Sequence, residues 1–322
     1  MTPILSIVIP VYNVSAYVEK CIRSCFDQSV GSEEFEVIVV DDGGTDNSLQ
    51  ICKGLLNDFP SMKIISQKNK GLSGARNTGL NHAKGNYVWF VDSDDWISSN
   101  CLKDIFHKLR SNSLDILWLG HDVIYNDKVT RQYIPTALEK PIYGETLFID
   151  YLNNLFYIWK FIYKRSFLEE NQLFFYEGIL YEDLEFTPRA LLKAKHCDTL
   201  PKAYYHYLMR EGSIINSIST KNVEDRFLIL NALHELKNEK NVSNKYKETL
   251  EKTIIHFFAG SVKMAARAKL PLPKTAYSII KKIKKKYGSS KNGNKDFKLM
   301  AISLKTYHKT YSSIYNLYKK VS

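Results

Sequence analysis

Three carboxylates crowd into four residues directly after an apolar run. The string DSDD places Asp92, Asp94 and Asp95 after residues 87–91, whose aromatic and β-branched side chains are typical of a buried strand. Neighbouring carboxylates repel one another, so the cluster needs a compensating positive charge. A cap on the next helix is the simple alternative, but a cap needs only one carboxylate.

Two carboxylates separated by one residue suit a hard divalent cation. Mg²⁺ and Mn²⁺ take oxygen ligands and are commonly held by one or two carboxylates together with substrate phosphates. An EF-hand-like calcium loop fits less well, because the downstream glycine and glutamate are missing. The pattern favours a Mn²⁺ or Mg²⁺ site at Asp92, Asp94 and Asp95, with a phosphate beside it.

A second acidic string, DDGGTD, follows another apolar run and begins with Asp41 and Asp42. An acidic pair at the end of a buried strand needs donors, and the ring N–H of a nucleobase is one. The glycines would let the backbone approach a ligand closely, although Asp-Gly and Gly-Gly also occur in plain turns.

Two further segments carry candidate groups. Arg76, in GLSGARNTG, suits phosphate or base contacts, and a solvated helix arginine is the alternative. That string lacks the spacing of a Walker loop and of GxGxxG. Glu182 and Asp183, in LYEDLEF, stand at a predicted helix start, where the helix dipole favours acids. A carboxylate apart from the metal pair is also what deprotonation of an acceptor hydroxyl requires.

The first hundred residues contain the elements that must position these groups. Short apolar runs alternate with stretches of helical spacing, which predicts βαβ units and a mostly parallel sheet. Ligands bind outside the carboxyl ends of the strands in such sheets, where PVYN, DDGG and DSDD all fall. Beyond Trp96 we expect a helix, a long strand over 114–125, a hairpin-like region and the acidic helix over 180–194. From about residue 221 onward the pattern is helical.

Composition and charge limit the class of protein. The apolar fraction of 44% and the charged fraction of 25% are those of a globular chain. The odd count of five cysteines, with no metal or redox spacing, indicates buried thiols in a cytosolic protein. No run is long enough to span a membrane, and the N-terminal apolar run reads as a strand rather than a signal peptide.

The positive charge is concentrated at the C-terminal end. Residues 260–322 hold 16 Lys or Arg and one acid, so the remainder of the chain is slightly acidic. Lysines and tyrosines interleave there with Ile and Leu, as in interfacial amphipathic helices, and a solvated charged face is the alternative. We predict peripheral attachment to the anionic inner face of the cell membrane. A nucleic-acid partner is not expected, because no base-stacking arrangement of a known module is present.

Taken together and in order, these strings resemble family 2 glycosyltransferases of the GT-A fold. The resemblance covers about residues 4–215, and its motifs are IVIPVYN, VIVVDDGGTDNS, GLSGARNTG, YVWFVDSDD, YEDLEF and REGSI. It implies a Rossmann-like, mixed but mostly parallel sheet flanked by helices, a UDP-sugar donor, and a glycan or lipid-linked acceptor. It also implies a single-addition, inverting enzyme of cell-surface polysaccharide synthesis.

By position, the resemblance gives roles to particular residues. Pro10 and Tyr12 would wall the uracil, and Asp42 would accept from its ring N–H. Asp183, with Glu182 beside it, would be the catalytic base. The implied nucleotide-sugar-binding set is Pro10, Tyr12, Asp41, Asp42, Arg76, Asp92, Ser93, Arg210 and Ser213. Asp92, Asp94 and Asp95 would hold the metal.

The chain departs from the family pattern at Gly44, where serine is usual; glycine removes a hydroxyl contact and loosens the turn. It also lacks Gln-x-x-Arg-Trp, which argues against a processive synthase. The rival interpretations are a sugar nucleotidyltransferase and a membrane-surface binding protein with a degenerate domain. Sugar nucleotidyltransferases have a Gly-rich, Arg-containing loop directly after the first strand. In this sequence that place is taken by PVYNVSAY, which contains neither glycine nor arginine. The segment YLMREGSI resembles the family's closing segment over the diphosphate, and we expect His206, near it, to be structural.

We expect a catalytic domain over residues 1–217, with a nucleotide half to about 97 and an acceptor half over 98–217. A basic, mostly helical region over 218–322 should follow.

Overall fold

The computed structural model describes residues 2–111, 113–210, 218–239, 242–287 and 295–321. The chain separates into two compact units, Met1–Arg210 and Glu211–Ser322. The division falls a few residues before the boundary at 217 expected from the sequence. The two units are described separately.

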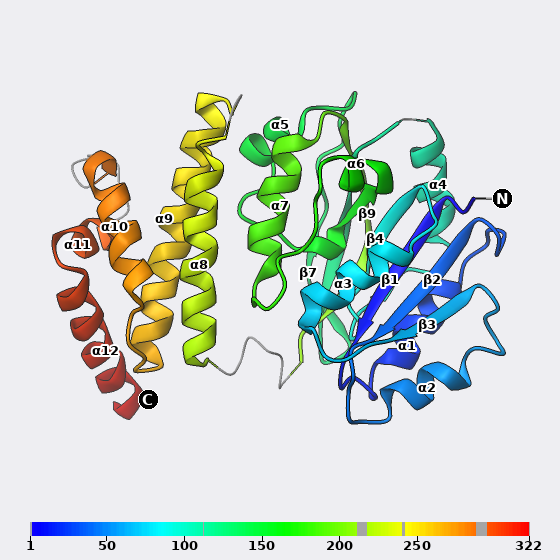
Figure 1. Ribbon diagram of the computed structural model, residues 1–322, viewed down its shortest axis with the longest axis horizontal. Helices are drawn as coiled ribbons and strands as arrows, with labels where there is room; N and C mark the ends of the chain where they lie inside the picture. Colours follow the sequence, from blue (N-terminus) through cyan, green and yellow to red (C-terminus); the bar gives the residue numbers. More distant parts are fainter. Residues whose placement is uncertain (1, 112, 211–217, 240–241, 288–294, 322) are drawn as a thin grey trace. The chain divides into compact units, whose positions relative to one another are not determined.

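The first unit is built on a twisted sheet whose N-terminal half is parallel. Strands β1 (Leu5–Val11), β2 (Phe35–Asp41), β3 (Met62–Ser66) and β4 (Tyr87–Phe90) pair in the order β3-β2-β1-β4, all parallel (Figure 1). Their connections are α1 (Val18–Phe26), α2 (Ser48–Gly54) and α3 (Gly71–His82). The predicted alternation is confirmed, and the carboxyl ends of these strands lie at one edge.

Helix α3 packs unusually close to the sheet. A Cβ at Gly79 would lie 2.2 Å from Val8 Cγ1 of β1, so only glycine permits this approach. The glycines of GLSGARNTG therefore belong to a helix against the sheet. This close packing places Arg76 of α3 inside the protein.

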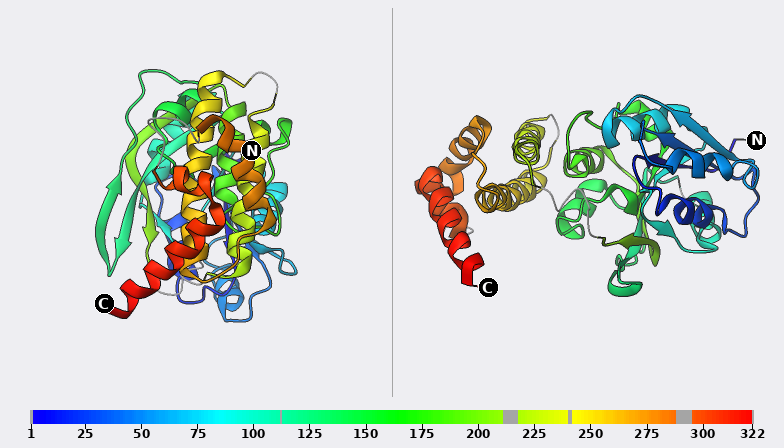
Figure 2. Two further views of the ribbon diagram at one scale, coloured as in Figure 1. Left: turned by 90° about the vertical axis from the view of Figure 1, so that its left-hand side faces the viewer. Right: turned by 90° about the horizontal axis from the view of Figure 1, so that it is seen from below.

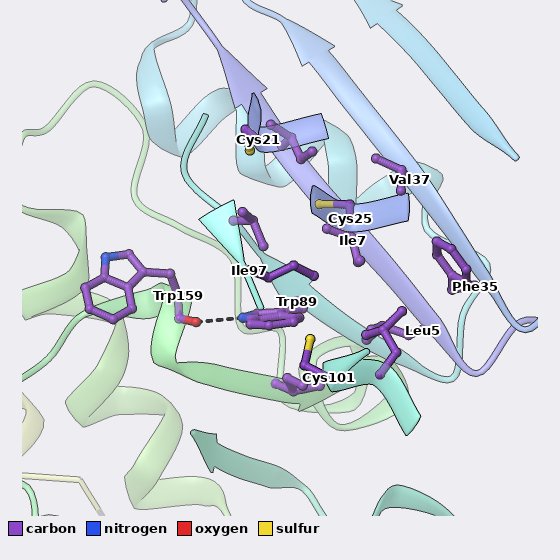
Figure 3. Packing of buried hydrophobic residues seen from close by; sticks show 14 of the residues in the cluster. Leu5, Ile7, Cys21, Cys25, Phe35, Val37, Trp89, Ile97, Cys101 and Trp159 are labelled. Carbon is purple, nitrogen blue, oxygen red and sulfur yellow. Dashed lines mark hydrogen bonds between the residues drawn. The ribbon is translucent and has the colours of Figure 1, made fainter. Parts of the chain in front are cut away.

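Apolar side chains fill the space between the sheet and the helices on one side of it. Leu5 and Ile7 of β1 pack with Cys21 and Cys25 of α1, and the Trp89 indole donates to the Trp159 carbonyl at 2.6 Å (Figure 3). All five cysteines are free and buried, as predicted.

The C-terminal half of the sheet is mixed. Strand β8 (Phe161–Lys164) pairs antiparallel with β4 and with β6 (Ile116–Tyr125), while β9 (Cys197–Leu208) lies parallel to β6 and antiparallel to β5 (Trp96–Ile97). Strand β7 (Lys128–Tyr133) pairs with β6 and forms a hairpin that projects from the sheet (Figure 2). The mixed sheet flanked by helices confirms the predicted fold class.

Strand β8 was not predicted, because WKFIYK lacks a clear two-residue alternation. It follows the 3-10 turn η1 (Ile158–Lys160) and leads directly into α6 (Arg165–Glu170). The other helices of this unit are α4 (Cys101–Ser111), α5 (Gly144–Asp150) and α7 (Glu182–Lys193). Helix α7 has the acidic first turn expected from the sequence.

The described residues of the second unit form helices only: α8 (Thr220–Leu236), α9 (Asn244–Arg267), α10 (Lys274–Tyr287), α11 (Lys295–Ile302) and α12 (Leu304–Val321) (Figure 2). Ser219 caps α8 through a reciprocal capping box with Asn222. Ala276, Ile279 and Ile283 of α10 are buried. No helix within the described ranges is long and apolar enough to cross a membrane.

Candidate active site

Two acidic loops meet at the edge of the sheet where β1, β2 and β4 end. Strand β2 runs into Asp41 and Asp42, and β4 runs into residues 92–95. Because both strands are parallel to β1 between them, the two loops emerge on the same side of the molecule. The motifs predicted to share a site are therefore brought to one edge.

The loop after β2 is held in place by hydrogen bonds. Asp42 is buried, and its Oδ1 accepts from Gln67 Nε2 at 2.7 Å and from the Lys70 backbone N–H at 2.8 Å. Asp41 is also buried, and its Oδ1 accepts from the Gly43 N–H at 3.3 Å. No hydrogen bond to Asp42 Oδ2 is found within the described ranges, so this oxygen can accept from another donor.

The end of β1 closes this loop from the other side. Asn13 Oδ1 accepts from the Thr45 N–H at 2.7 Å and from the Asp46 N–H at 3.3 Å. A Cβ at Gly44 would lie 3.0 Å from the Asn13 backbone nitrogen, so the turn is tightly held although it has glycine there. Of the residues expected to wall a base, Tyr12 is exposed and Pro10 is buried within β1.

Arg76 joins the loop after β4 to the start of α7. Its Nη2 donates to Asp92 Oδ1 at 2.6 Å, and its Nη1 donates to Glu182 Oε1. Burial opposes its charge, but the carboxylates of Asp92 and Glu182 outweigh that effect and raise the pKa of Arg76. The alternative of a solvated helix arginine is therefore wrong: only 2% of Arg76 is exposed.

The three carboxylates of DSDD have different partners. Asp92 contacts Arg76, and Asp94 Oδ2 accepts from Arg210 Nε at 2.8 Å. Asp95 points into the protein, where it accepts from the Tyr205 hydroxyl at 2.6 Å and from the Leu208 N–H at 2.8 Å. Burial and the neighbouring carboxylates raise the pKa of both Asp94 and Asp95. Neither acid caps α4, which begins at Cys101.

Asp183 lies in the first turn of α7, next to the Arg76 bridge. Tyr181 precedes this turn with a left-handed backbone, φ 64°, an uncommon conformation for a tyrosine. Asp183 Oδ1 accepts from the Leu184 N–H at 2.7 Å. Burial and the charge of Glu182 raise the pKa of Asp183 to about 7, which suits a general base near neutral pH.

Asp92 and Asp94 fit a divalent cation shared with a phosphate. One carboxylate oxygen of each accepts a hydrogen bond from an arginine, Arg76 at Asp92 and Arg210 at Asp94. A cation would also relieve the repulsion that raises the pKa of Asp94. No group of three or more His, Cys, Asp or Glu in the part of the chain that the structure covers is arranged as a metal site.

Some important contacts were missed by the sequence interpretation. Gln67, Asn13 and Tyr205 orient the acidic loops, and of these only Asn13 stood in a string already singled out, PVYN. Lys160 is completely buried, and its Nζ has no hydrogen-bond partner within the described ranges. Ser93 is buried beside Asp92, and Ser213 lies outside the described residues.

His206 has a structural environment. Its ring stacks on Trp96, and its nitrogens contact Asp122 Oδ2 at 3.3 Å and Ser98 Oγ at 2.8 Å. These contacts join β9, β6 and the segment after β5.

Comparison with known proteins identifies the family. The family model for glycosyl transferase family 2 matches residues 6–171, and the chain belongs to this family. It is 34% identical to the uncharacterized glycosyltransferase EpsJ of Bacillus subtilis over 66% of this chain and 63% of EpsJ. It is also 32% identical to TarS of Staphylococcus aureus, a poly(ribitol-phosphate) beta-N-acetylglucosaminyltransferase, over 66% of this chain and 37% of that protein. The chain thus spans less than two thirds of the length of either relative.

Two solved structures share the fold. TarS residues 1–349 in complex with UDP-GlcNAc superimpose with a TM-score of 0.76, at 23% identity, over 99% of this chain and 92% of that one. The mannosyltransferase PcManGT of Pyrobaculum calidifontis, in complex with GDP-Man and Mn²⁺, gives a TM-score of 0.57 at 14% identity, over 99% and 88% of the two chains. The mixed sheet flanked by helices is therefore that of a GT-A glycosyltransferase.

Proposed function

We propose that this protein transfers a single sugar from a UDP-sugar to a hydroxyl group of a glycan or lipid-linked acceptor, with inversion, in cell-surface polysaccharide synthesis. The observation that carries the proposal is the Arg76 bridge. Arg76 binds Asp92 of the loop after β4 and also Glu182 of the acidic helix α7, and Glu182 lies 106 residues from Arg76 in the chain. Arg76 thereby connects the loop proposed to bind the donor with the helix start that carries the proposed base, Asp183.

The family and the relatives support the donor and the acceptor class. Members similar to this chain include EpsJ and TarS, and TarS has been crystallised with UDP-GlcNAc. The name of TarS describes transfer of N-acetylglucosamine to poly(ribitol-phosphate). Family membership favours this proposal over the sugar nucleotidyltransferase alternative.

On this proposal, Tyr12 and Pro10 contact the uracil, and Asp42 Oδ2 accepts from its ring N–H. Asp41 supports that loop from beside Asp42. Arg76 neutralises charge at Asp92 from within the protein, and Ser93 of the same loop belongs to the nucleotide-sugar-binding set. Arg210 and Ser213 belong to the segment that contacts the diphosphate.

A Mn²⁺ or Mg²⁺ ion held by Asp92 and Asp94 would neutralise charge on the departing UDP. Asp95 belongs to the metal motif by sequence, but both of its oxygens accept hydrogen bonds from β9. We therefore assign Asp95 the role of orienting Asp92 and Asp94. The supporting contact is the Tyr205 hydroxyl, which also accepts from the Asp92 N–H at 3.1 Å.

The reaction balances with the groups present. Asp183 accepts the proton of the acceptor hydroxyl. An electron pair on the acceptor oxygen then forms the new bond to the anomeric carbon. The bond from that carbon to the phosphate oxygen breaks, and UDP leaves with its electrons. Because the attack is from the opposite face, an α-linked donor gives a β-linked product.

Calorimetric titration of UDP, with and without Mn²⁺, tests the donor site. We expect binding that depends on Mn²⁺ and is lost in Asp94→Ala, but is kept in Asp58→Ala, a control carboxylate at the surface. A panel of UDP-sugars then identifies the donor from the release of UDP. If UDP does not bind to the wild type with Mn²⁺ present, the uridine assignment is wrong.

We further propose that the second unit attaches peripherally to the anionic inner face of the cell membrane. Several lysines of α10 and α12 are exposed, and so are Leu299 and Ile302 of α11, the latter by 78%. The buried isoleucines of α10 are not free to insert into lipid. Electrostatic attraction with shallow insertion of α11 is therefore the form of attachment we propose.

A further inference from the structure

A set of stacked aromatic rings runs from the DSDD loop toward the acidic helix. Trp159 stacks on Tyr205, with ring centroids 4.3 Å apart and planes 5° apart, and on Tyr157 at 5.0 Å and 7°. Tyr207 lies beside them, 5.7 Å from Trp159 and 6.3 Å from Tyr157. Four nearly parallel rings from η1, its preceding residue and β9 thus form one aromatic stack.

The inner end of this stack is rigidly held. Tyr205 is fully buried, donates its hydroxyl proton to Asp95 Oδ2 and accepts from the Asp92 N–H. The Trp159 carbonyl accepts from Trp89 Nε1, a contact visible in the core of the unit (Figure 3). The positions of these rings are therefore coupled to that of the acidic loop.

The outer end is fixed to the helix that carries Asp183. Phe156, immediately before Tyr157, has its carbonyl bonded to Thr187 Oγ1 at 2.7 Å. Thr187 stands four residues after Asp183 on α7, and so on the same face of the helix. Burial and the negative charge of Asp183 raise the pKa of Tyr157, which agrees with this proximity.

The two outer rings are the accessible ones. Tyr157 is 37% exposed and Tyr207 is half-buried, whereas 3% of Trp159 is exposed and Tyr205 is buried. Burial and the charge of Asp95 raise the pKa of Tyr207 to about 12. A flat apolar ring with a polar tip, held rigidly, suits the C–H face of a sugar.

We propose that Tyr157 and Tyr207 form the platform on which the acceptor's sugar ring stacks, with its reacting hydroxyl facing Asp183. The inference rests on the proposed transfer reaction and narrows its acceptor to a chain that presents a sugar ring rather than a simple lipid alcohol. The acceptor is chosen over the donor because Tyr157 is anchored to the helix of the base, whereas the uridine residues lie at the ends of β1 and β2.

Direct binding tests the platform without the need for turnover. Methyl glycosides of glucose, galactose and N-acetylglucosamine serve as probes, because they lack an aromatic aglycone that would stack by itself. Saturation-transfer NMR with UDP and Mn²⁺ present should show binding that is kept in Tyr157→Phe and weakened about tenfold in Tyr157→Leu. Tyr125→Leu, at an exposed position of the β6–β7 hairpin, is the control.

Kinetics with the best donor and probe separate acceptor from donor binding. In Tyr157→Leu we expect the acceptor KM to rise about tenfold, with the donor KM and the Kd of UDP within about twofold of wild type. A thermal melt close to that of wild type shows that the variant is folded. Unchanged acceptor binding and KM in Tyr157→Leu would overturn the platform. Failure of the wild type to bind UDP would instead overturn the transfer reaction, while glycoside binding would still test the rings.

Discussion

The solvent exposure of the side chains alternates along residues 92–95, so the three carboxylates of this string have different surroundings. Asp92 and Asp94 are partly exposed, while Ser93 and Asp95 are buried. Asp95 would be a costly buried charge if it lacked its bonds to Tyr205 and Leu208. The repulsion within the string is therefore offset from two directions, by arginines at Asp92 and Asp94 and by neutral donors at Asp95.

At Asp183 we expect opposite effects on activity and stability. Asp183→Asn should lower kcat by about 10²–10⁴-fold because the base is lost. It should raise Tm at pH 8, because the fold raises the pKa of Asp183 from about 3.9 to about 7. Between these two pKa values the fold holds a proton that the unfolded chain releases, so the stability contributed by Asp183 falls as the pH rises and is fully lost above about pH 7.

Differential scanning calorimetry from pH 8 down to pH 4 checks this expectation. The gain in Tm should shrink as the pH falls, since both states then hold the proton. Asp58→Asn, at an exposed site, should show no such pattern. A constant difference across the range would contradict the raised pKa.

Between elements, Arg76 is the main connection of the site. From α3 it forms ion pairs with Asp92 of the loop after β4 and with Glu182 in the first turn of α7. Removal of one member of a buried ionic network leaves the other charges unpaired. The resulting loss of stability is larger than the stability that the intact network contributes.

We therefore expect Arg76→Met to lower the free energy of unfolding by about 3–5 kcal/mol and to abolish turnover. Urea unfolding followed by circular dichroism gives this value. Arg23→Met is the control, because Arg23 pairs with Glu19 at the surface, where an ion pair contributes little, and its loss should leave stability close to that of wild type. A loss at Arg76 no greater than at Arg23 would show that the bridge is dispensable.

Lys160 of η1 is also a buried basic side chain, and its Nζ has no hydrogen-bond partner among the residues that the structure describes. Burial lowers its pKa well below the ordinary value, although the charge of Asp183 acts in the opposite direction. The unfolded chain keeps this proton up to about pH 10.4, so it binds more protons than the fold between the two pKa values. Stability contributed by this residue therefore rises with pH over that interval.

Lys160→Met should consequently be more stable than wild type at pH 7, by about 1–3 kcal/mol. The advantage should diminish as the pH approaches 10. Urea unfolding of both proteins at several pH values gives the difference between their free energies of unfolding. The contributions of all other titrating groups cancel in this difference. A difference that grows with pH would contradict a lowered pKa.

Considered as a whole, the molecule separates its two charges between its two units. The acidic loops belong to residues 1–210, and the excess of lysine belongs to the second unit. The net positive charge of the chain is therefore a property of the second unit and does not describe the acidic loops of the first.

We expect the exposed lysines of the second unit to govern membrane binding. Their conversion to glutamine should reduce sedimentation with phosphatidylglycerol-containing vesicles at least tenfold, at roughly 1 kcal/mol per lysine. The four positions are Lys274, Lys281, Lys305 and Lys309.

A matched variant removes the same charge from exposed positions of the first unit, namely Lys53, Lys68, Lys84 and Lys128. It should bind vesicles as wild type does, and high salt should release both proteins. Equal loss in the two variants would indicate only a general effect of net charge.

The parallel half of the sheet could be predicted from the sequence because its signals are local. Runs such as IVIP and FEVIVV specify strands by their own side chains, and the helices between them have a clear apolar face. The placement of PVYN, DDGG and DSDD at one edge follows from that order alone. The acidic first turn of α7 was equally visible, because a helix start is a local feature.

Only the tertiary structure decided which groups meet. Arg76 could be a solvated helix residue until α3 packed on β1 and buried it between Asp92 and Glu182. The antiparallel strand β8 and the stack at Trp159 depend on neighbours supplied by β4, β6 and β9. The physical reason is that periodicity reports which face of a segment is apolar, whereas partners distant in sequence are set by sheet order and burial.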